Sequence, residues 1–356
     1  MKHPSCRPTH GLAVRPIRTG ALVAGGLATL ALVACGSADT SSTDSATTTA
    51  ATASTDATFK GGQSIGGKKI LFIHANDAGN VFDKPVIAGA DAAAALTGLK
   101  VDTQFSNNDD KQLRSIFQSG VAEKVAGIIV SVPDASLNKP ICAARQAGIP
   151  VMAWNVNGVT GAATSCVMAF LGQDFVQTGA VIGHRMINDG LIKQGAKVFC
   201  PVEYPNSDYA AKRASGVNEA LKSIGAKCDV VGVGADQAKA KTTIVQYLLG
   251  HRDTNAIVSL GGTPNSVAVA AVKQAGLSDV KLGGFDLTPQ IIDGIKQGKI
   301  AVTADQQPYS QGFFAVMQMA TYLKFGLFPS SIATGGTGLV DKSNVDLVAS
   351  LVPDYR

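Results

Sequence analysis

The strongest constraint on the fold of this chain is a segment order that occurs twice at one spacing. Three pairs of similar segments lie 128 residues apart: Ile70 and Val198, Ile129-Val130-Ser131 and Ile257-Val258-Ser259, and Arg145-Gln146-Ala147-Gly148 and Lys273-Gln274-Ala275-Gly276. Because a single spacing recurs at several points, the pattern indicates two similar folding units in tandem.

Short apolar runs alternate with amphipathic stretches within each unit. The apolar runs predict strands at residues 69–73, 101–105, 127–131 and 150–155, and again at 197–199, 228–233, 255–260 and 281–286. The amphipathic stretches predict helices at 83–96, 109–123, 210–224, 239–249 and 266–276. This alternation is typical of α/β domains with a doubly wound parallel sheet. We therefore expect two similar domains of that class.

The first 34 residues have the features of an export signal. Four basic residues precede an apolar run from Gly20 to Ala34, and this order predicts secretion. The run is shorter than the roughly 20 residues that span a bilayer. Leu32-Val33-Ala34-Cys35 resembles a bacterial lipobox, which implies cleavage before Cys35 and lipidation of its sulfur. The alternative is an ordinary signal peptide with an incidental cysteine.

Residues 35–67 are expected to form a flexible tether. Within them, residues 36–58 contain 13 Ser or Thr and no large apolar side chain. Such a segment cannot bury enough surface to offset the entropy that ordering would cost.

The net charge belongs largely to the signal segment. Without residues 1–34 the chain keeps 27 basic and 26 acidic side chains, a net charge of +1. This balance gives no electrostatic reason to expect nucleic acid or an anionic surface as a partner.

Four cysteines remain after Cys6 leaves with the signal and Cys35 takes lipid. They are Cys142, Cys166, Cys200 and Cys228. An even count in an oxidising compartment favours disulfides, and pairing within each domain would join Cys142 to Cys166 and Cys200 to Cys228. Four buried free thiols are the alternative. Their spacing matches no zinc motif, and no metal site is expected.

Polar side chains follow the predicted strands, where an open parallel sheet binds its ligands. The first domain offers Asn76, Asp77, Asn80, Phe82, Asp83, Asp134, Trp154 and Asn155. The second offers Tyr204, Asn206, Asp208, Tyr209, Gly261, Thr263, Asn265 and Asp286. Amides, carboxylates and aromatic rings suit a neutral ligand rich in hydroxyl groups. A phosphate ligand would call for lysines, arginines or a glycine-rich loop, which are not concentrated here.

Several of these residues have a structural alternative. Asp286 could cap the helix that begins near Pro289, although the repeat, after a slip of three residues, sets it opposite Asn155 and favours a ligand role. Trp154 could belong to the core. Phe82 could pack at the start of a helix, and Arg213, inside a predicted helix, suits a structural ion pair better than a ligand contact.

The common catalytic motifs are missing from the sequence. The sequence has no G-x-S-x-G, H-E-x-x-H, P-loop or complete G-x-G-x-x-G motif. His74, His184 and His251 are isolated, without a nearby sequence partner for acid–base chemistry. We therefore expect neither an enzyme nor a bound cofactor.

The chain resembles the type I solute-binding proteins of ABC importers, in the ribose-binding-protein-like branch related to LacI-type regulators. The resemblance covers about residues 68–340. Its markers are Asn80-Val81-Phe82, Ser131-Val132-Pro133-Asp134, Arg145-Gln146-Ala147-Gly148-Ile149-Pro150, Leu171-Gly172-Gln173-Asp174, Gly284-Phe285-Asp286 and Ala304-Asp305-Gln306-Gln307-Pro308.

The resemblance implies ligand contacts from Asn80, Phe82, Asp286 and Gln306, with Phe82 stacking on the ligand. It also implies a hinge of several crossovers, near 173–174, 306–307 and 333–334. The N-terminal domain would then comprise residues 68–173 and 307–333, and the C-terminal domain 174–306 and 334–356.

Two positions depart from the ribose-binding pattern. Asn155 and Val156 stand where an Asp-Arg pair is expected, and the helix arginine that reaches a sugar is replaced near Ala211. These changes disfavour ribose and favour another neutral monosaccharide or a linear polyol.

The sequence thus predicts a lipid-anchored, monomeric receptor outside the cytoplasm that delivers a sugar or sugar alcohol to a membrane permease by hinge closure. A separate ATPase would supply the energy. One alternative is a sensor for a sugar-like signal of the autoinducer type. Another is an exported lipoprotein hydrolase, which would need a reactive Ser or Cys beside a histidine. An export signal and the lack of a helix-turn-helix oppose a transcription regulator.

Overall fold

The computed structural model describes residues 61–336 and 338–356. The predicted signal peptide, Cys35 and most of the predicted tether therefore lie outside the described residues. Within the part that is described, no helix combines the length and the apolar character that crossing a membrane requires.

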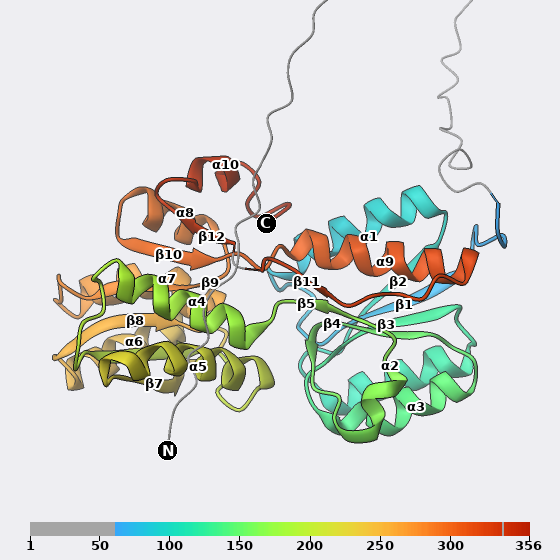
Figure 1. Cartoon of the computed structure of the whole chain (residues 1–356), viewed down its shortest axis with the longest axis horizontal. Coiled ribbons are helices and arrows are strands. Elements are labelled where there is room, and N and C mark those ends of the chain that lie inside the picture. Colours follow the sequence, from blue (N-terminus) through green and yellow to red (C-terminus); the bar gives the residue numbers. More distant parts are fainter. Residues whose placement is uncertain (1–60, 337) are drawn as a thin grey trace, which may run out of the picture. The chain divides into compact units, whose positions relative to one another are not determined.

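The N-terminal lobe is built on a six-stranded sheet with the order β11-β5-β4-β3-β1-β2 (Figure 1). All its neighbouring strands run parallel. The strands are β1 (Lys69–His74), β2 (Lys100–Phe105), β3 (Gly127–Val132), β4 (Val151–Asn157), β5 (Phe170–Gly172) and β11 (Ile332–Ala333).

Helices cover both faces of this sheet. Helices α1 (Asp83–Thr97) and α9 (Pro308–Phe325) pack on one face, and α2 (Asp110–Ala122) and α3 (Asn138–Gln146) pack on the other. Gly89 and Gly312 allow α1 and α9 to approach closely, since a Cβ at either position would collide with the backbone of the partner helix.

The C-terminal lobe repeats this plan with the strand order β12-β10-β9-β8-β6-β7. Only β12 runs antiparallel to its neighbour. The strands are β6 (Lys197–Val202), β7 (Lys227–Gly232), β8 (Thr254–Ser259), β9 (Lys281–Phe285), β10 (Ile300–Ala304) and β12 (Leu339–Asp341).

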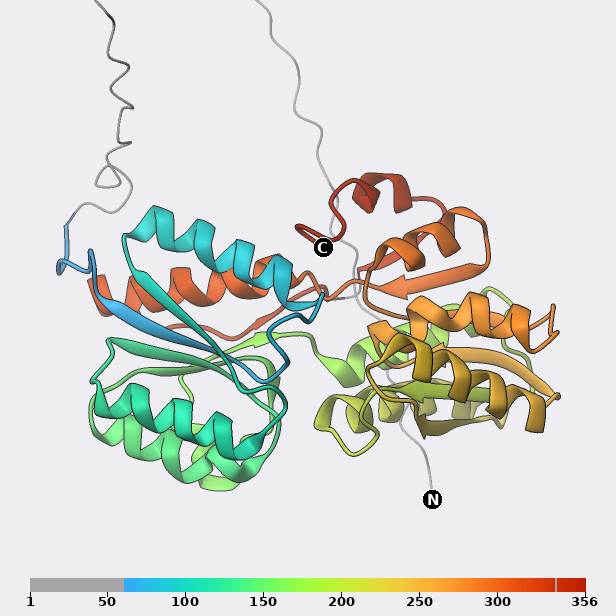
Figure 2. The same cartoon turned by 180° about the vertical axis from the view of Figure 1, so that it is seen from behind.

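The helices of the C-terminal lobe also lie on two faces, which Figure 2 shows from behind. One core cluster joins α4 (Phe175–Asn188) and α5 (Asp208–Leu221) to the sheet. The other joins α6 (Gln237–Gly250), α7 (Gly262–Gln274), α8 (Pro289–Lys296) and α10 (Val345–Ala349). Gly179 and Gly216 bring α4 and α5 together as Gly89 and Gly312 do in the first lobe.

The expected fold class, two doubly wound α/β domains, is confirmed. Strands β1 and β6 begin at Lys69 and Lys197, at the spacing of the repeat. The chain passes between the sheets after β5, after β10 and after β11. The residue-level domain boundaries stay a prediction.

Element ends differ from expectation by a few residues. β4 continues to Asn157, whereas the predicted strand ends at Asn155. α7 begins at Gly262 rather than Ser266, and α5 begins at Asp208 and ends at Leu221. The first turns of both helices contain polar residues, so apolar periodicity alone does not show where these helices begin.

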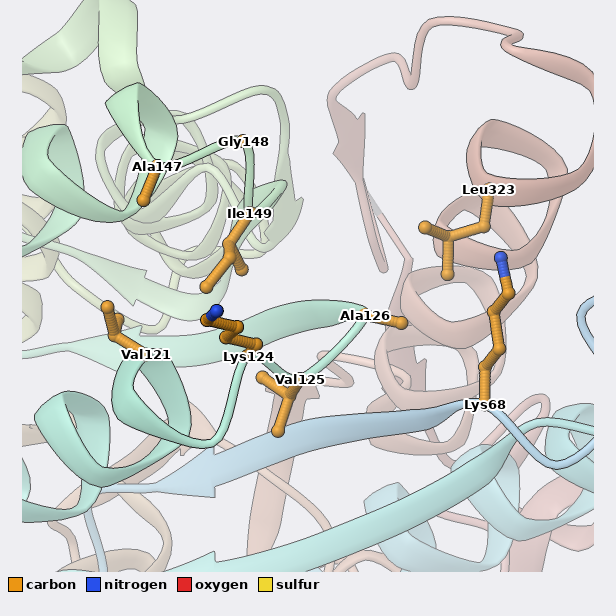
Figure 3. A pocket seen from close by; sticks show the side chains of 9 residues that line it. All are labelled: Lys68, Val121, Lys124, Val125, Ala126, Ala147, Gly148, Ile149 and Leu323. Atoms are coloured by element: carbon orange, nitrogen blue, oxygen red, sulfur yellow. The ribbon is translucent and has the colours of Figure 1, made fainter.

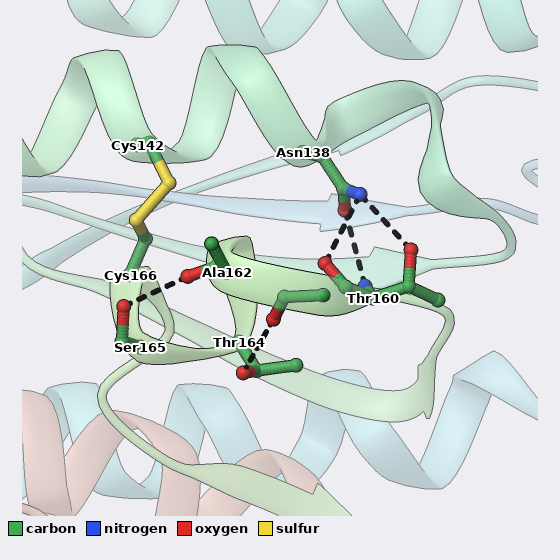
Figure 4. The surroundings of a disulfide bond; sticks show 8 residues. Asn138, Cys142, Thr160, Ala162, Thr164, Ser165 and Cys166 are labelled. Atoms are coloured by element: carbon green, nitrogen blue, oxygen red, sulfur yellow. Dashed lines mark hydrogen bonds between the residues drawn. A yellow bond between two sulfur atoms is a disulfide. The ribbon is translucent and has the colours of Figure 1, made fainter.

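Two disulfides are present, with the pairings expected within each domain. Cys142 of α3 is bonded to Cys166 (Figure 4), and Cys200 of β6 is bonded to Cys228 of β7. Near the first bond, Asn138 and Thr160 exchange hydrogen bonds that hold the chain between β4 and the 3₁₀ helix Gly161–Cys166 against α3.

Candidate ligand-binding site

Of the non-glycine residues with positive φ, three lie at or just beyond the carboxyl ends of β4, β9 and β10. They are Asn155 in β4 (φ 57°), Asp286 after β9 (φ 69°) and Gln307 after β10 (φ 55°). This left-handed region is unfavourable for L-residues, although short polar side chains tolerate it best, and strained positions of this kind cluster at functional sites.

Asp286 is joined to the N-terminal lobe by amide side chains. Gln306 Nε2 donates a short hydrogen bond to Asp286 Oδ1. Asn155 Nδ2 donates to Gln306 Oε1 and to Gln311 Oε1, at 3.4 Å each. The network therefore runs from the end of β9, through the segment after β10, to the end of β4.

Arg213 is buried beside Asp286. Only 2% of the residue is exposed, and its guanidinium carbon lies 4.1 to 5.3 Å from the ring centroids of Phe285, Phe175 and Tyr209. Its Nη1 donates to Leu260 O at 2.7 Å and lies 4.0 Å from Asp286 Oδ2. These contacts make Arg213 the ion-pair partner of Asp286, and a ligand contact from Arg213 stays a prediction.

Glu203 directly follows β6 and lies near Asp286. It is not among the residues predicted from the sequence. It accepts hydrogen bonds from Thr263 N at 2.8 Å and from Tyr209 Oη at 2.9 Å. A Cβ at position 261 would collide with its carboxylate, so Gly261 makes room for it. The sequence analysis named Tyr204 but not Glu203. A carboxylate that directly follows an apolar strand is a signal that could have identified it.

Burial shifts the pKa values of both carboxyl groups upward. Desolvation raises the pKa of Glu203, and the charge of Asp286 adds to that rise. Desolvation also raises the pKa of Asp286, while the positive charge of Arg213 opposes the rise.

Three buried polar atoms around this network have no hydrogen-bond partner among the described residues. They are Gln173 Nε2, Arg213 Nε and Asn265 Oδ1. The other ends of these groups are fixed: Gln173 Oε1 accepts from Arg213 Nη2 at 3.3 Å, and Asn265 Nδ2 donates to Phe285 O at 2.9 Å. Unpaired buried polar atoms are costly, so this region has unused capacity for a polar ligand.

The end of β1 in the N-terminal lobe holds a different cluster. His74 Nδ1 lies 2.9 Å from Asp83 Oδ1, and Asn76 Nδ2 donates to Asp83 Oδ2 at 3.0 Å. The description of His74 as isolated is therefore wrong: its partner lies nine residues ahead, across the β1–α1 turn. His74 and Asp83 are each 1% exposed.

Trp154 belongs to the core, so its expected place at the ligand site is corrected. It is 1% exposed, lies within β4 rather than at its end, and donates from Nε1 to Ile73 O at 3.0 Å. Its ring packs edge-on against His74. The side chain lies on the face of the sheet that α1 and α9 cover, where it joins their core cluster.

Other predicted residues of the N-terminal lobe hold local turns. Asn80 Oδ1 accepts from Phe82 N at 3.0 Å, and half-buried Phe82 packs against the core at the start of α1. Asp77 accepts from Asn108 Nδ2, and Asp134 caps a short 3₁₀ helix. Phe82 thus has the helix-entry packing that was the alternative to stacking on a ligand.

Two further predicted residues of the C-terminal lobe lie between β6 and α5. Tyr204 and Asn206 are exposed on the turn before α5. Burial raises the pKa of Tyr204, with smaller contributions from the charges of Asp77 and Glu203. The described residues contain no group of three potential metal ligands.

Residues 71–327 match the periplasmic binding protein domain family. The chain belongs to that family. This membership confirms the resemblance and the expectation of a binding protein rather than an enzyme.

Two relatives of this periplasmic binding protein are named for sugars. The xylose/arabinose-binding protein XylF of Sulfolobus acidocaldarius is 26% identical over 78% of this chain and 72% of its own length. The ribose import binding protein RbsB of Bacillus subtilis is 25% identical over 64% of this chain and 73% of its own length.

Solved structures of similar fold include a carbohydrate transporter from Acidothermus cellulolyticus 11B in complex with myo-inositol. It is 30% identical, with a TM-score of 0.73 over 81% of this chain and 98% of that chain. A galactofuranose-binding protein has the same TM-score of 0.73 at 18% identity, a similarity that concerns the fold alone.

Proposed function

We propose that this protein binds a neutral monosaccharide or sugar alcohol between its two lobes and delivers it to the permease of an ABC importer. The observation that carries the proposal is the network from Asp286 through Gln306 to Asn155. Buried polar atoms beside it have no hydrogen-bond partner among the described residues.

The chemistry of this network favours hydroxyl groups. A hydroxyl can donate to Asp286 and accept from Gln173 Nε2 or Arg213 Nε, so one polyol satisfies both kinds of atom. Arg213 already has Asp286 as a neighbour at 4.0 Å, which leaves little need for a charged ligand. Asn265 Oδ1 would accept from a further hydroxyl.

The relatives support this ligand class. The names of XylF and RbsB specify pentoses, and the structure that is 30% identical was solved with a cyclic polyol. We therefore add cyclic polyols to the candidate ligands, beside the neutral monosaccharides and linear polyols expected from the sequence.

The proposed mechanism is closure about the three passages between the lobes. A ligand that contacts Asp286 on one lobe and Asn155 on the other is bound more tightly in the closed state, and it shifts the population toward that state. A lipid on Cys35 would keep this monomeric receptor at the outer side of the membrane, near a permease driven by a separate ATPase.

A thermal-shift panel tests the ligand class. It includes pentoses, hexoses, linear alditols of four to six carbons and myo-inositol, with amino acids as the comparison. A ligand at one hundred times its Kd stabilises a protein by about 2.7 kcal/mol, so we expect the cognate polyol to raise Tm by several degrees. Shifts with amino acids and none with polyhydroxyl compounds would overturn the proposal.

A further inference from the structure

The amino ends of the strands in the N-terminal lobe form a surface that the proposed function does not use. We call it the amino-end face, and it comprises residues 62–68, 121–126, 147–149 and 322–328. Gln63 N donates to Lys324 O at 2.8 Å, which ties the first described residues to the end of α9 (Figures 1 and 2). Because the strands are parallel, this face lies at the sheet edge opposite Asn76 and Asn155.

A pocket of about 480 Å³ opens on this face. Figure 3 shows Lys68 and Lys124 on opposite sides of its apolar floor, which includes Val125 and Ala126. A second pocket shares Lys68 and Leu323 with the first and adds Lys324. The two pockets therefore form one apolar hollow bordered by three ammonium groups.

These three lysines form no ion pair among the described residues, and Glu123, the carboxylate within the face, is paired with Lys69. Within residues 61–336 and 338–356, Lys68, Lys124 and Lys324 have no carboxylate within 4 Å, whereas Lys69 holds both Asp102 and Glu123 at 2.8 and 2.9 Å. A near-neutral chain thus carries a locally basic face.

Two large apolar side chains project beside the lysines. Leu327 is 59% exposed and Phe328 is 68% exposed, in the loop that follows α9. Phe328 meets Tyr322 edge-on, which holds its ring near the end of that helix. Exposed aromatic and aliphatic groups next to lysines are typical of surfaces that dock on anionic lipid.

We propose that the amino-end face docks on an anionic phospholipid surface, with Lys68, Lys124 and Lys324 at the phosphates and with Leu327 and Phe328 in the interfacial layer. The strand carboxyl ends would then face away from the lipid and stay accessible to ligand. The proposal does not depend on the identity of the ligand.

The place where the described residues begin supports a lipid occupant. Cys35 lies 26 residues before Gly61, and 26 residues reach at most about 90 Å when fully extended. If Cys35 is lipidated, the tether joins the body at this face and holds it near the bilayer at a high effective concentration.

Amide hydrogen exchange of the mature full-length protein with vesicles tests the proposal. One set of vesicles is phosphatidylcholine alone, and the other contains equal amounts of phosphatidylcholine and phosphatidylglycerol. We expect protection of residues 62–68, 121–126 and 322–328 with the anionic vesicles at low salt, and loss of that protection at high salt.

Two variants separate the charge from the apolar contribution. The triple variant Lys68→Gln, Lys124→Gln, Lys324→Gln should weaken docking about 100-fold, or about fivefold for each lysine. Leu327→Ser with Phe328→Ser should weaken docking while keeping its preference for anionic lipid. The matched control is Lys239→Gln, Lys273→Gln, Lys299→Gln, which removes the same charge from exposed positions of the other lobe.

Equal exchange with and without anionic vesicles would overturn the proposal, and so would equal docking by the triple variant and its control. Neither result would bear on sugar binding, because the ligand residues are on another part of the protein. Ligand-induced thermal shifts measured on the same samples keep the two hypotheses distinct.

Discussion

The carboxyl ends of β1 and β9 use their polar residues in opposite ways. At β1, His74, Asp83 and Asn76 satisfy one another at 2.9 to 3.0 Å, and aromatic rings surround the imidazole. At β9, Asp286 and Arg213 are held 4.0 Å apart, and neighbouring polar atoms of Gln173, Arg213 and Asn265 have no described partner.

The difference shows where ligand-binding energy can come from. A cluster whose hydrogen bonds are complete gains nothing from a ligand, so the β1 cluster acts as a rigid support for its lobe. A cluster with unpaired buried groups gains the hydrogen bonds that it lacks. We therefore expect substitutions at β1 to change stability, and substitutions at β9 to change affinity as well.

The largest effect is expected from Arg213→Met. Removing one member of a buried charge pair leaves Asp286 uncompensated, and it should lower the free energy of unfolding by about 3–5 kcal/mol. Chemical denaturation measures this change. Arg185 also contacts two carboxylates but is partly exposed, so Arg185→Met should cost about 1 kcal/mol or less. Equal losses in the two variants would contradict the assigned role of Arg213.

Asp286→Asn should weaken binding of the best polyol from the thermal-shift panel by about 100-fold. A hydrogen bond to a charged group contributes about 1.5–3 kcal/mol, and the amide cannot accept as the carboxylate does. Titration calorimetry gives the affinity. Asp293→Asn, on the exposed side of α8 in the same lobe, is the control. Full affinity in the Asp286 variant would exclude it from the site.

His74→Phe tests whether the β1 cluster contributes to stability alone. The substitution keeps a ring between Phe105 and Trp154 but removes the contact with Asp83, and it should cost about 1–3 kcal/mol of stability. Affinity for the same polyol should change by no more than a few fold. A loss of affinity as large as that of Asp286→Asn would show that the β1 cluster takes part in binding.

Glu203→Gln should produce the smallest effect, visible as a change in pH dependence. Burial raises the pKa of Glu203 above its unfolded value, so the folded state holds the proton more strongly. The resulting stabilisation is complete below the unfolded pKa, about 4.3, and is lost as pH rises through the folded value.

Denaturation curves between pH 4 and pH 7 test this sign. The wild type should lose stability relative to Glu203→Gln as pH rises across that interval, and Asp286, whose pKa is also raised, contributes a background common to both proteins. A constant difference between the two proteins would contradict a raised pKa at Glu203.

The sequence predicted most of the fold because the repeat and the alternation are long-range patterns. It also named Asn155, Asp286 and Gln306, which the structure joins by hydrogen bonds; their contact with a ligand stays a prediction. Trp154 was misplaced because apolar periodicity does not show which helices will cover a side chain near the end of a strand. The partners of His74 and Arg213 depend on turns and helix packing, which local spacing does not determine.

Glu203 and the basic amino-end face show a second limit of the sequence. Glu203 becomes important only when Gly261 and Tyr209 come to lie beside it. The net charge of the chain does not show that Lys68, Lys124 and Lys324 border one hollow, because residues far apart in sequence meet there.

A crystal structure of the protein with the polyol that gives the largest thermal shift tests the central claim most directly. We expect ligand hydroxyls within about 3 Å of the Asp286 carboxylate and of Gln173 Nε2 or Arg213 Nε, with the His74–Asp83 contact unchanged. A ligand that contacts none of these three groups would contradict the account.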